Sequence, residues 1–142
     1  MTELITVINS FQELDLETEN AIKYYFVEEK FKKDELIIQE GEICNKIYFI
    51  KSGTVRRFCI ENGLELTRWI YTDEQFVTSL SSFFEQRPSF ENFQACQETI
   101  VYSLSYKDEQ ILLQYPLFSK FHIIQLRFIY LKLMNFIICL EL

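Results

Sequence analysis

NKIYFIKSGTV, residues 45–55, runs from an apolar segment through the turn dipeptide Ser52-Gly53 into Val55. Isoleucine, phenylalanine, tyrosine and valine are enriched in strands, whereas a glycine supplies the conformational freedom that a tight turn requires. The stretch therefore predicts a strand, a sharp turn and the start of a second strand.

The next turn signal is Asn62-Gly63, which separates apolar runs at residues 55–60 and 64–71. Both turn residues tolerate the positive φ of a two-residue hairpin loop, so the pair predicts two antiparallel strands. Turn signals of the same kind punctuate residues 27–106. Many short strands at this spacing are typical of a barrel or jelly roll, which protects sheet edges.

Helical patterns flank this strand region on both sides. Residues 1–26 are predicted to form an N-terminal helical segment, in which Asp15 is placed to cap a short helix that reaches Phe26. Residues 107–142 predict a short helix and, beyond Pro116, a long one. Nothing marks an internal boundary, so we expect the 142 residues to form a single domain.

The composition limits the possible classes of function. A formal net charge of −7, with 14 basic residues scattered among 21 acidic ones, makes nucleic acid a poor partner. The first ten residues lack the features of a signal peptide, so we expect a cytoplasmic location. His122 is the only histidine, and we assign no metal site and no catalytic residue. The cysteines are far apart and expected to be reduced: Cys44, Cys59, Cys96 and Cys139.

Three motifs together resemble a known family. They are Gly41-Glu42, residues 45–55 and Gly63-Leu64-Glu65. Their order is similar to the Gly-acid turn, the strand with its Gly-x-Val turn and the Gly-x-Glu hairpin of the cyclic-nucleotide-binding domain in Crp/Fnr transcription regulators. The resemblance implies a mostly β fold with flanking helices: a jelly-roll β-barrel, or double-stranded β-helix, followed by a long C-terminal dimerisation helix.

The resemblance also locates the family's phosphate-binding cassette. Counting back from Ala95, which resembles the alanine closing the cassette, Thr78-Ser79 stands where the family has Gly-Glu, and Ser89-Phe90 where it has Arg-Ser. The missing arginine would contact the cyclic phosphate, and the missing glutamate would accept a bond from the ribose hydroxyl. We therefore do not expect cyclic AMP to bind.

Candidate ligand-binding residues are those of the altered cassette: Thr78, Ser79, Ser82, Arg87, Ser89 and Phe90. Arg87 is a possible substitute cation, although an arginine beside Pro88 in a loop is more typical of solvated surface. The ring of Phe90 favours a small, partly apolar effector of unknown identity. No cofactor is expected, because the clustered N-terminal cysteines of iron-sulfur members and the histidine of haem-binding members have no counterpart here.

The terminal helix carries apolar residues at alternating steps of four and three, which is a coiled-coil seam. A second apolar series lies on another side, as expected for a helix that also packs on its own barrel. Arg127, Lys132 and Asn135 interrupt the apolar run and exclude a membrane span. The seam predicts a homodimer through Phe121, Ile124, Phe128, Leu131, Asn135 and Ile138.

The leading hypothesis is the sensor and dimerisation half of a Crp/Fnr-like regulator with a degenerate cassette. It does not itself bind nucleic acid, because the family's winged helix-turn-helix pattern is missing after Asn135. The chain is interpreted as a truncated relative or as a fragment of a longer reading frame. Two alternatives remain: a cupin-like barrel enzyme, which needs converging histidine and carboxylate ligands, and a true cyclic-nucleotide-binding module.

Overall fold

The computed structural model describes the backbone of residues 1–141 and the side chains of residues 1–135. The helices are α1 (Thr2–Phe11), α2 (Leu16–Tyr25), α3 (Leu80–Glu85), α4 (Tyr106–Leu112) and α5 (Pro116–Glu141). The strands are β1 (Val27–Phe31), β2 (Leu36–Ile38), β3 (Lys46–Ser52), β4 (Val55–Glu61), β5 (Leu64–Tyr71), β6 (Phe76–Val77), β7 (Asn92–Ala95) and β8 (Thr99–Ser105).

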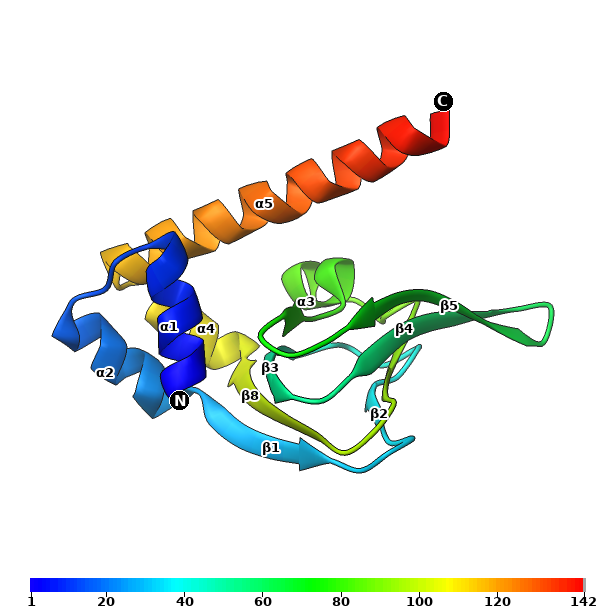
Figure 1. Cartoon of the computed structure of the whole chain (residues 1–142), viewed down its shortest axis with the longest axis horizontal. Coiled ribbons are helices and arrows are strands. Elements are labelled where there is room, and N and C mark those ends of the chain that lie inside the picture. The colour runs from blue at the N-terminus through cyan, green and yellow to red at the C-terminus, as the bar shows by residue number, and fades with distance from the viewer. Residues whose placement is uncertain (142) are drawn as a thin grey trace.

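The strands form two four-stranded sheets, with the orders β1-β8-β3-β6 and β2-β7-β4-β5 (Figure 1). Every pairing within them is antiparallel. Helices α1 and α2 precede the sheets, α4 and α5 follow them, and α3 interrupts the strand order. The predicted mostly β fold with flanking helices and a long C-terminal helix is confirmed.

Local sequence explains where helix α2 begins and where strand β4 turns into β5. Asp15 caps α2 as predicted, because its Oδ1 accepts a hydrogen bond of 2.9 Å from the Thr18 backbone N–H. The predicted hairpin is also confirmed: β4 and β5 are joined by Asn62 and Gly63, whose φ values are 53° and 77°. Both residues lie in the left-handed region that this turn requires.

Gly53, between β3 and β4, is the turn residue most constrained by its surroundings. Its φ is 131°, and its N–H donates a 2.8 Å hydrogen bond to Oδ1 of Asp73. A Cβ at this position would lie 2.7 Å from the backbone Cα of Thr99. Only glycine fits this contact without displacing the start of β8.

Two apolar cores lie on opposite faces of β3, because successive side chains of a strand point to opposite sides. Tyr48 and Ile50 belong to the core between the sheets, whereas Phe49 belongs to the core beneath the helices. The core between the sheets contains Ile38, Cys44, Tyr48, Ile50, Val55, Val77, Phe83, Phe93 and Val101. The helical core contains Leu4, Ile5, Ile8, Ala21, Ile22, Phe26, Phe49, Tyr102, Leu104, Leu112, Phe118 and Phe121.

Helix α5 packs on this helical core at its N-terminal end and then extends away from the sheets (Figure 1). Phe121 is only 4% exposed, and its ring centre lies 6.1 Å from that of Phe11 and 5.8 Å from that of Phe76. Its assignment to the dimer seam is therefore corrected, because a side chain buried in its own chain has little surface left for a partner. Ile138 lies outside the described side chains.

No helix in the part of the chain that the structure describes combines the length and the apolarity needed to cross a bilayer.

Glu109 on α4 gives the stability of this fold a specific pH dependence. The side chain is 2% exposed, one carboxylate oxygen has no hydrogen-bond partner, and burial raises the pKa of the carboxyl to about 7. The pKa of this carboxyl is higher in the folded than in the unfolded chain. Its contribution to the free energy of unfolding is therefore fully present below the unfolded pKa of 4.5 and is lost as the pH rises towards 7.

Glu109→Gln is expected to remove this pH dependence. The free energy of unfolding of the variant, relative to that of the parent chain, should therefore be about 2 kcal/mol higher at pH 8 than at pH 5. Urea unfolding at both pH values measures the difference. Glu13→Gln makes the same chemical change at an exposed position and should leave the pH dependence unchanged. The same change in the free energy of unfolding between pH 5 and pH 8 in the parent chain and in Glu109→Gln would show that Glu109 is not the source of the pH dependence.

Candidate functional site

The altered cassette lies between β6 and β7 and includes α3. Its first candidate, Thr78, is held by neighbouring backbone: its Oγ1 donates a 3.0 Å hydrogen bond to the carbonyl of Lys46 and lies 3.4 Å from Sγ of Cys44. Ser82 is fully buried, and its Oγ accepts a 2.8 Å bond from the Cys44 N–H. It also donates to the Arg87 carbonyl. Both hydroxyls serve the local backbone.

The structure brings Ser79 and Ser89 together. The two side chains are 3% and 2% exposed, and their Oγ atoms are hydrogen-bonded at 2.9 Å. Ser89 Oγ also lies 2.8 Å from the Glu91 carbonyl and accepts a 3.2 Å bond from the Glu91 N–H. The positions where the family has a glutamate and an arginine thus hold two buried serines whose hydroxyls are hydrogen-bonded to each other.

The other two candidates lie on the surface. Arg87 forms an ion pair with Glu85, and its side chain is 65% exposed. Phe90 is 74% exposed, so its ring does not line an enclosed site. The structure therefore does not bring Phe90 together with the buried cassette residues, because its side chain projects into solvent while that of its neighbour Ser89 turns inward.

Sequence reasoning missed the charged centre of this site, which is Arg57 on β4. Arg57 pairs in register with Phe93, a buried residue of the core between the sheets, and lies two residues from the core residue Val55. It therefore occupies an inward-facing position on its strand. Its Nε lies 3.0 Å from Oε2 of Glu91, and both side chains are only about one-third exposed (28% and 32%).

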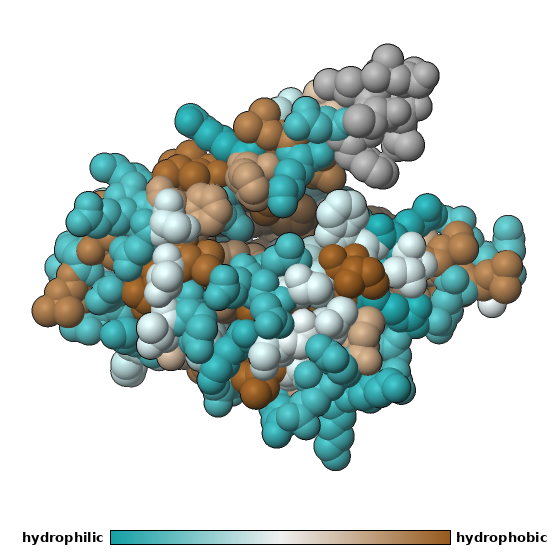
Figure 2. All heavy atoms as spheres, in the orientation of Figure 1, coloured by the Kyte–Doolittle hydropathy of each residue, from teal (hydrophilic) through white to brown (hydrophobic). Residues whose placement is uncertain are grey.

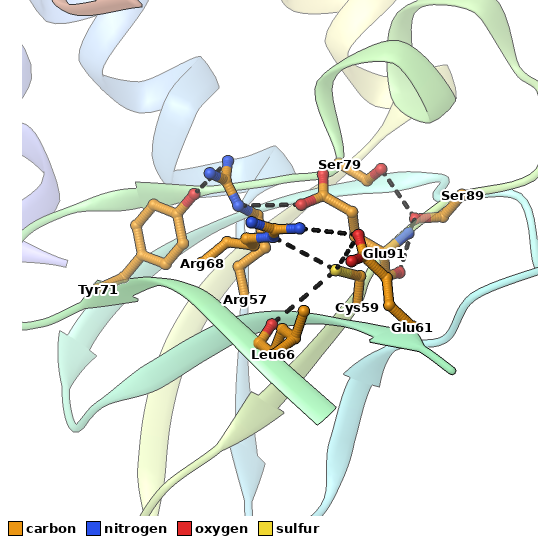
Figure 3. A network of polar contacts seen from close by, with 9 residues as sticks. All are labelled: Arg57, Cys59, Glu61, Leu66, Arg68, Tyr71, Ser79, Ser89 and Glu91. Atoms are coloured by element: carbon orange, nitrogen blue, oxygen red, sulfur yellow. Dashed lines mark hydrogen bonds and ion pairs between the residues drawn. The ribbon is translucent and has the colours of Figure 1, made fainter. Parts of the chain in front are cut away.

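Figure 3 shows the Arg57 guanidinium between Tyr71 and the Glu91 carboxylate. Nη1 of Arg57 donates a 3.4 Å hydrogen bond to the Tyr71 hydroxyl. Burial raises the pKa of that hydroxyl above its ordinary value, so Tyr71 acts as a neutral acceptor. Alternation along β4 is the sequence signal for this site, because an arginine at the inward position after Val55 breaks the apolar pattern.

A second charged group lies nearby on the β4-β5 hairpin (Figure 3). Arg68 donates from Nε to Sγ of Cys59 at 3.4 Å and from Nη2 to Oε1 of Glu61 at 2.8 Å. On the outer side of the same strands, Nη2 of Arg56 donates to Oε2 of Glu65 at 2.6 Å. Each arginine between residues 56 and 87 thus has a carboxylate partner.

Within the described residues, no three histidine, cysteine, aspartate or glutamate side chains are grouped so that they could hold a metal ion. Cys44, Cys59 and Cys96 are free thiols. The polar contacts of the site are hydrogen bonds and ion pairs that involve the strand arginines, their carboxylates and the buried hydroxyls.

The sequence profile of the cyclic nucleotide-binding domain matches residues 28–115, which is more than half of the chain. The chain belongs to this family. The matched region contains β1 from its second residue, the other seven strands, the cassette and α4, so the resemblance seen in the turn motifs is confirmed. A comparison with curated protein sequences finds no match.

Solved structures show the same fold. The Thermus thermophilus catabolite activator protein is 18% identical with a TM-score of 0.78, covering 92% of this chain and 61% of its own. The sensor domain of the transcriptional regulator DNR from Pseudomonas aeruginosa is 15% identical with a TM-score of 0.76, and the match covers 96% of this chain and 89% of the DNR sensor domain. A regulatory subunit of a cAMP-independent protein kinase A from Trypanosoma cruzi, bound to guanosine, is 20% identical with a TM-score of 0.65. The match covers 78% of this chain and 40% of the kinase subunit.

Proposed function

We propose that this cyclic nucleotide-binding domain is the sensor part of a Crp/Fnr-like transcription regulator and that it does not bind cyclic AMP or cyclic GMP. The observation that carries the proposal is the buried pair Ser79 and Ser89, whose hydroxyls satisfy each other at 2.9 Å. Neither side chain can supply the charge that a cyclic phosphate needs. The nearest cassette arginine, Arg87, is exposed and paired with Glu85.

The proposed effector is an uncharged small molecule. The Trypanosoma cruzi neighbour, which is cAMP-independent and bound to guanosine, supports the idea that this fold can hold a nucleoside without a phosphate. We propose no catalytic activity, since the family is a regulatory binding family and the described site has no metal-binding group. Because the net charge is −7, the proposed regulation acts through another domain or partner rather than through direct contact with nucleic acid. The proposed location is the cytoplasm.

Titration calorimetry with cyclic AMP and cyclic GMP tests the proposal. We expect no dissociation constant tighter than about 100 μM for either nucleotide, because the charge-assisted contacts are missing. The positive control is a family member whose cassette keeps the Gly-Glu and Arg-Ser pairs, measured under the same conditions. A low-micromolar dissociation constant for the present chain would show that it is a true cyclic-nucleotide-binding module.

We further propose that the partner of α5 is a second copy of this chain. Beyond Phe121 the helix exposes many large apolar side chains, and a soluble monomer rarely leaves so large a contiguous apolar patch in water. Figure 2 shows hydrophobic side chains on the visible face of this helix, interspersed with hydrophilic ones. The exposed side chains are Ile123, Leu126, Phe128, Tyr130, Leu131, Leu133 and Met134.

A second copy fits this surface because a symmetric pair covers the same patch on both chains at once. A large apolar side chain gains about 1.5–3 kcal/mol on full burial. The seven side chains are about half exposed in the single chain, so burying them on both copies would gain about 10–20 kcal/mol, against an association cost of about 4–15 kcal/mol. Leu126, Tyr130 and Leu131, together with Arg127, also line a shallow apolar hollow on the helix. A side chain of the second helix would fill such a hollow, as knobs fill holes in a coiled coil.

A further inference from the structure

The Arg57 guanidinium is the group in this site best suited to an acidic ligand. It lies on the inward face of β4, and its side chain is 28% exposed. An arginine that is partly removed from water binds carboxylates and phosphates more strongly than a solvated one, because the surrounding dielectric is lower. A free guanidinium here would therefore attract an anion.

Glu91 already occupies that position. Its Oε2 lies 3.0 Å from Nε of Arg57, and its backbone is fixed on both sides by the buried hydroxyl of Ser89. Ser89 is in turn bonded to Ser79 in the cassette. The chain therefore holds a carboxylate of its own against the guanidinium, next to the two serines that replace the family's charged residues.

We infer that Glu91 is a built-in counterion, whose carboxylate takes the place of a ligand's acidic group at Arg57 and so closes this domain to anionic effectors. The inference rests on the proposed function and explains why the effector must be uncharged. A ligand anion would have to displace a tethered carboxylate that is present at a very high effective concentration.

Glu91→Gln tests this directly, because it removes the charge and keeps the size of the side chain. Inorganic phosphate is the probe, and calorimetry and thermal shift are the readouts. We expect the dissociation constant of phosphate to fall at least about tenfold in Glu91→Gln, since the guanidinium is left without its counterion. Adenosine, an uncharged probe, should show no such change.

Two controls separate a specific site from a general change of surface charge. Glu85→Gln frees the exposed Arg87 by the same chemical change and should gain no phosphate affinity. The double variant Arg57→Gln/Glu91→Gln should lose the gain completely. If Glu91→Gln does not fold, Glu91→Asp withdraws the carboxylate by one methylene and should lower the dissociation constant about threefold or more, since the pair is weakened.

The possible failures are distinguishable. An unchanged phosphate affinity in the folded variant, or an equal gain in Glu85→Gln, overturns the counterion role of Glu91 alone. Tight binding of cyclic AMP by the parent chain overturns the proposed function, whatever the variants do.

Discussion

The chain carrying Leu131→Glu is expected to elute as a monomer of 17.1 kDa under conditions in which the parent chain is a dimer. Leu131 is 59% exposed on α5, and a second copy would bury it against the same helix of its partner. Two carboxylates would then lie close to each other in an apolar interface, where each is partly desolvated. We expect the dissociation constant of the dimer to rise by about 100-fold or more, a loss of about 3 kcal/mol.

Light scattering after size exclusion, at roughly micromolar to tens of micromolar chain, covers the affinity range at issue. Leu131 is a better test than Phe128, whose ring lies 5.9 Å from that of Phe11 in the same chain and so also stabilises the monomer. Leu16→Glu is the matched control, because Leu16 is 70% exposed and begins α2, where a carboxylate is well tolerated. A monomeric parent chain, or a dimeric Leu131→Glu variant, would contradict the proposed partner.

Gly53→Ala is expected to destabilise the fold by about 3 kcal/mol or more, which is a large share of the stability of a small domain. The added Cβ would meet the Thr99 backbone at 2.7 Å, and the residue would keep a φ of 131° that side chains rarely adopt. Relief requires the turn after β3 or the start of β8 to move, and the two segments are joined by the hydrogen bond from the Thr54 N–H to Thr99 Oγ1.

Gly63→Ala is the matched control for this effect. Gly63 also has a positive φ, of 77°, but nothing lies within 4 Å of the position a Cβ would take. It should therefore cost only about 1 kcal/mol, from backbone conformation alone. Urea unfolding followed by circular dichroism compares the two variants, and equal losses of stability would show that contact with Thr99 is unimportant.

The succession of strands and turns along the chain could be predicted from the sequence because the signals are local. Asn62-Gly63 specifies its hairpin through two residues, and Asp15 caps its helix through a contact three residues away. Helix α1 was expected only as part of a helical N-terminal segment. Its residues Leu4 and Ile8 are fully buried against the rest of the chain, so tertiary packing stabilises a helix whose N-cap makes no side-chain hydrogen bond.

The centre of the candidate site could not be predicted because it depends on contacts between distant strands. Arg57 and Glu91 are separated by more than 30 residues, and only the pairing of β4 with β7 brings them together. Sequence reasoning instead selected Arg87 and Phe90 by their position in the cassette, and the structure places both on the surface. The helix face of Phe121 was assigned to the wrong neighbour for a similar reason, since periodicity shows that a face is apolar but not what covers it.

The pairing of β1 with β8 has a consequence for the chain while it is being made. Val27 pairs with Ser103, 76 residues later, so a ribosome adding about 5–20 residues per second leaves β1 without its partner for roughly 4–15 seconds. An unpaired strand is a template for aggregation, and charged side chains are a common protection against it. Glu28, Glu29 and Lys30 fill the middle of β1, and in the folded chain they form ion pairs with Lys51, Lys46 and Glu98. The same three charges would keep the nascent strand soluble until its partner emerges.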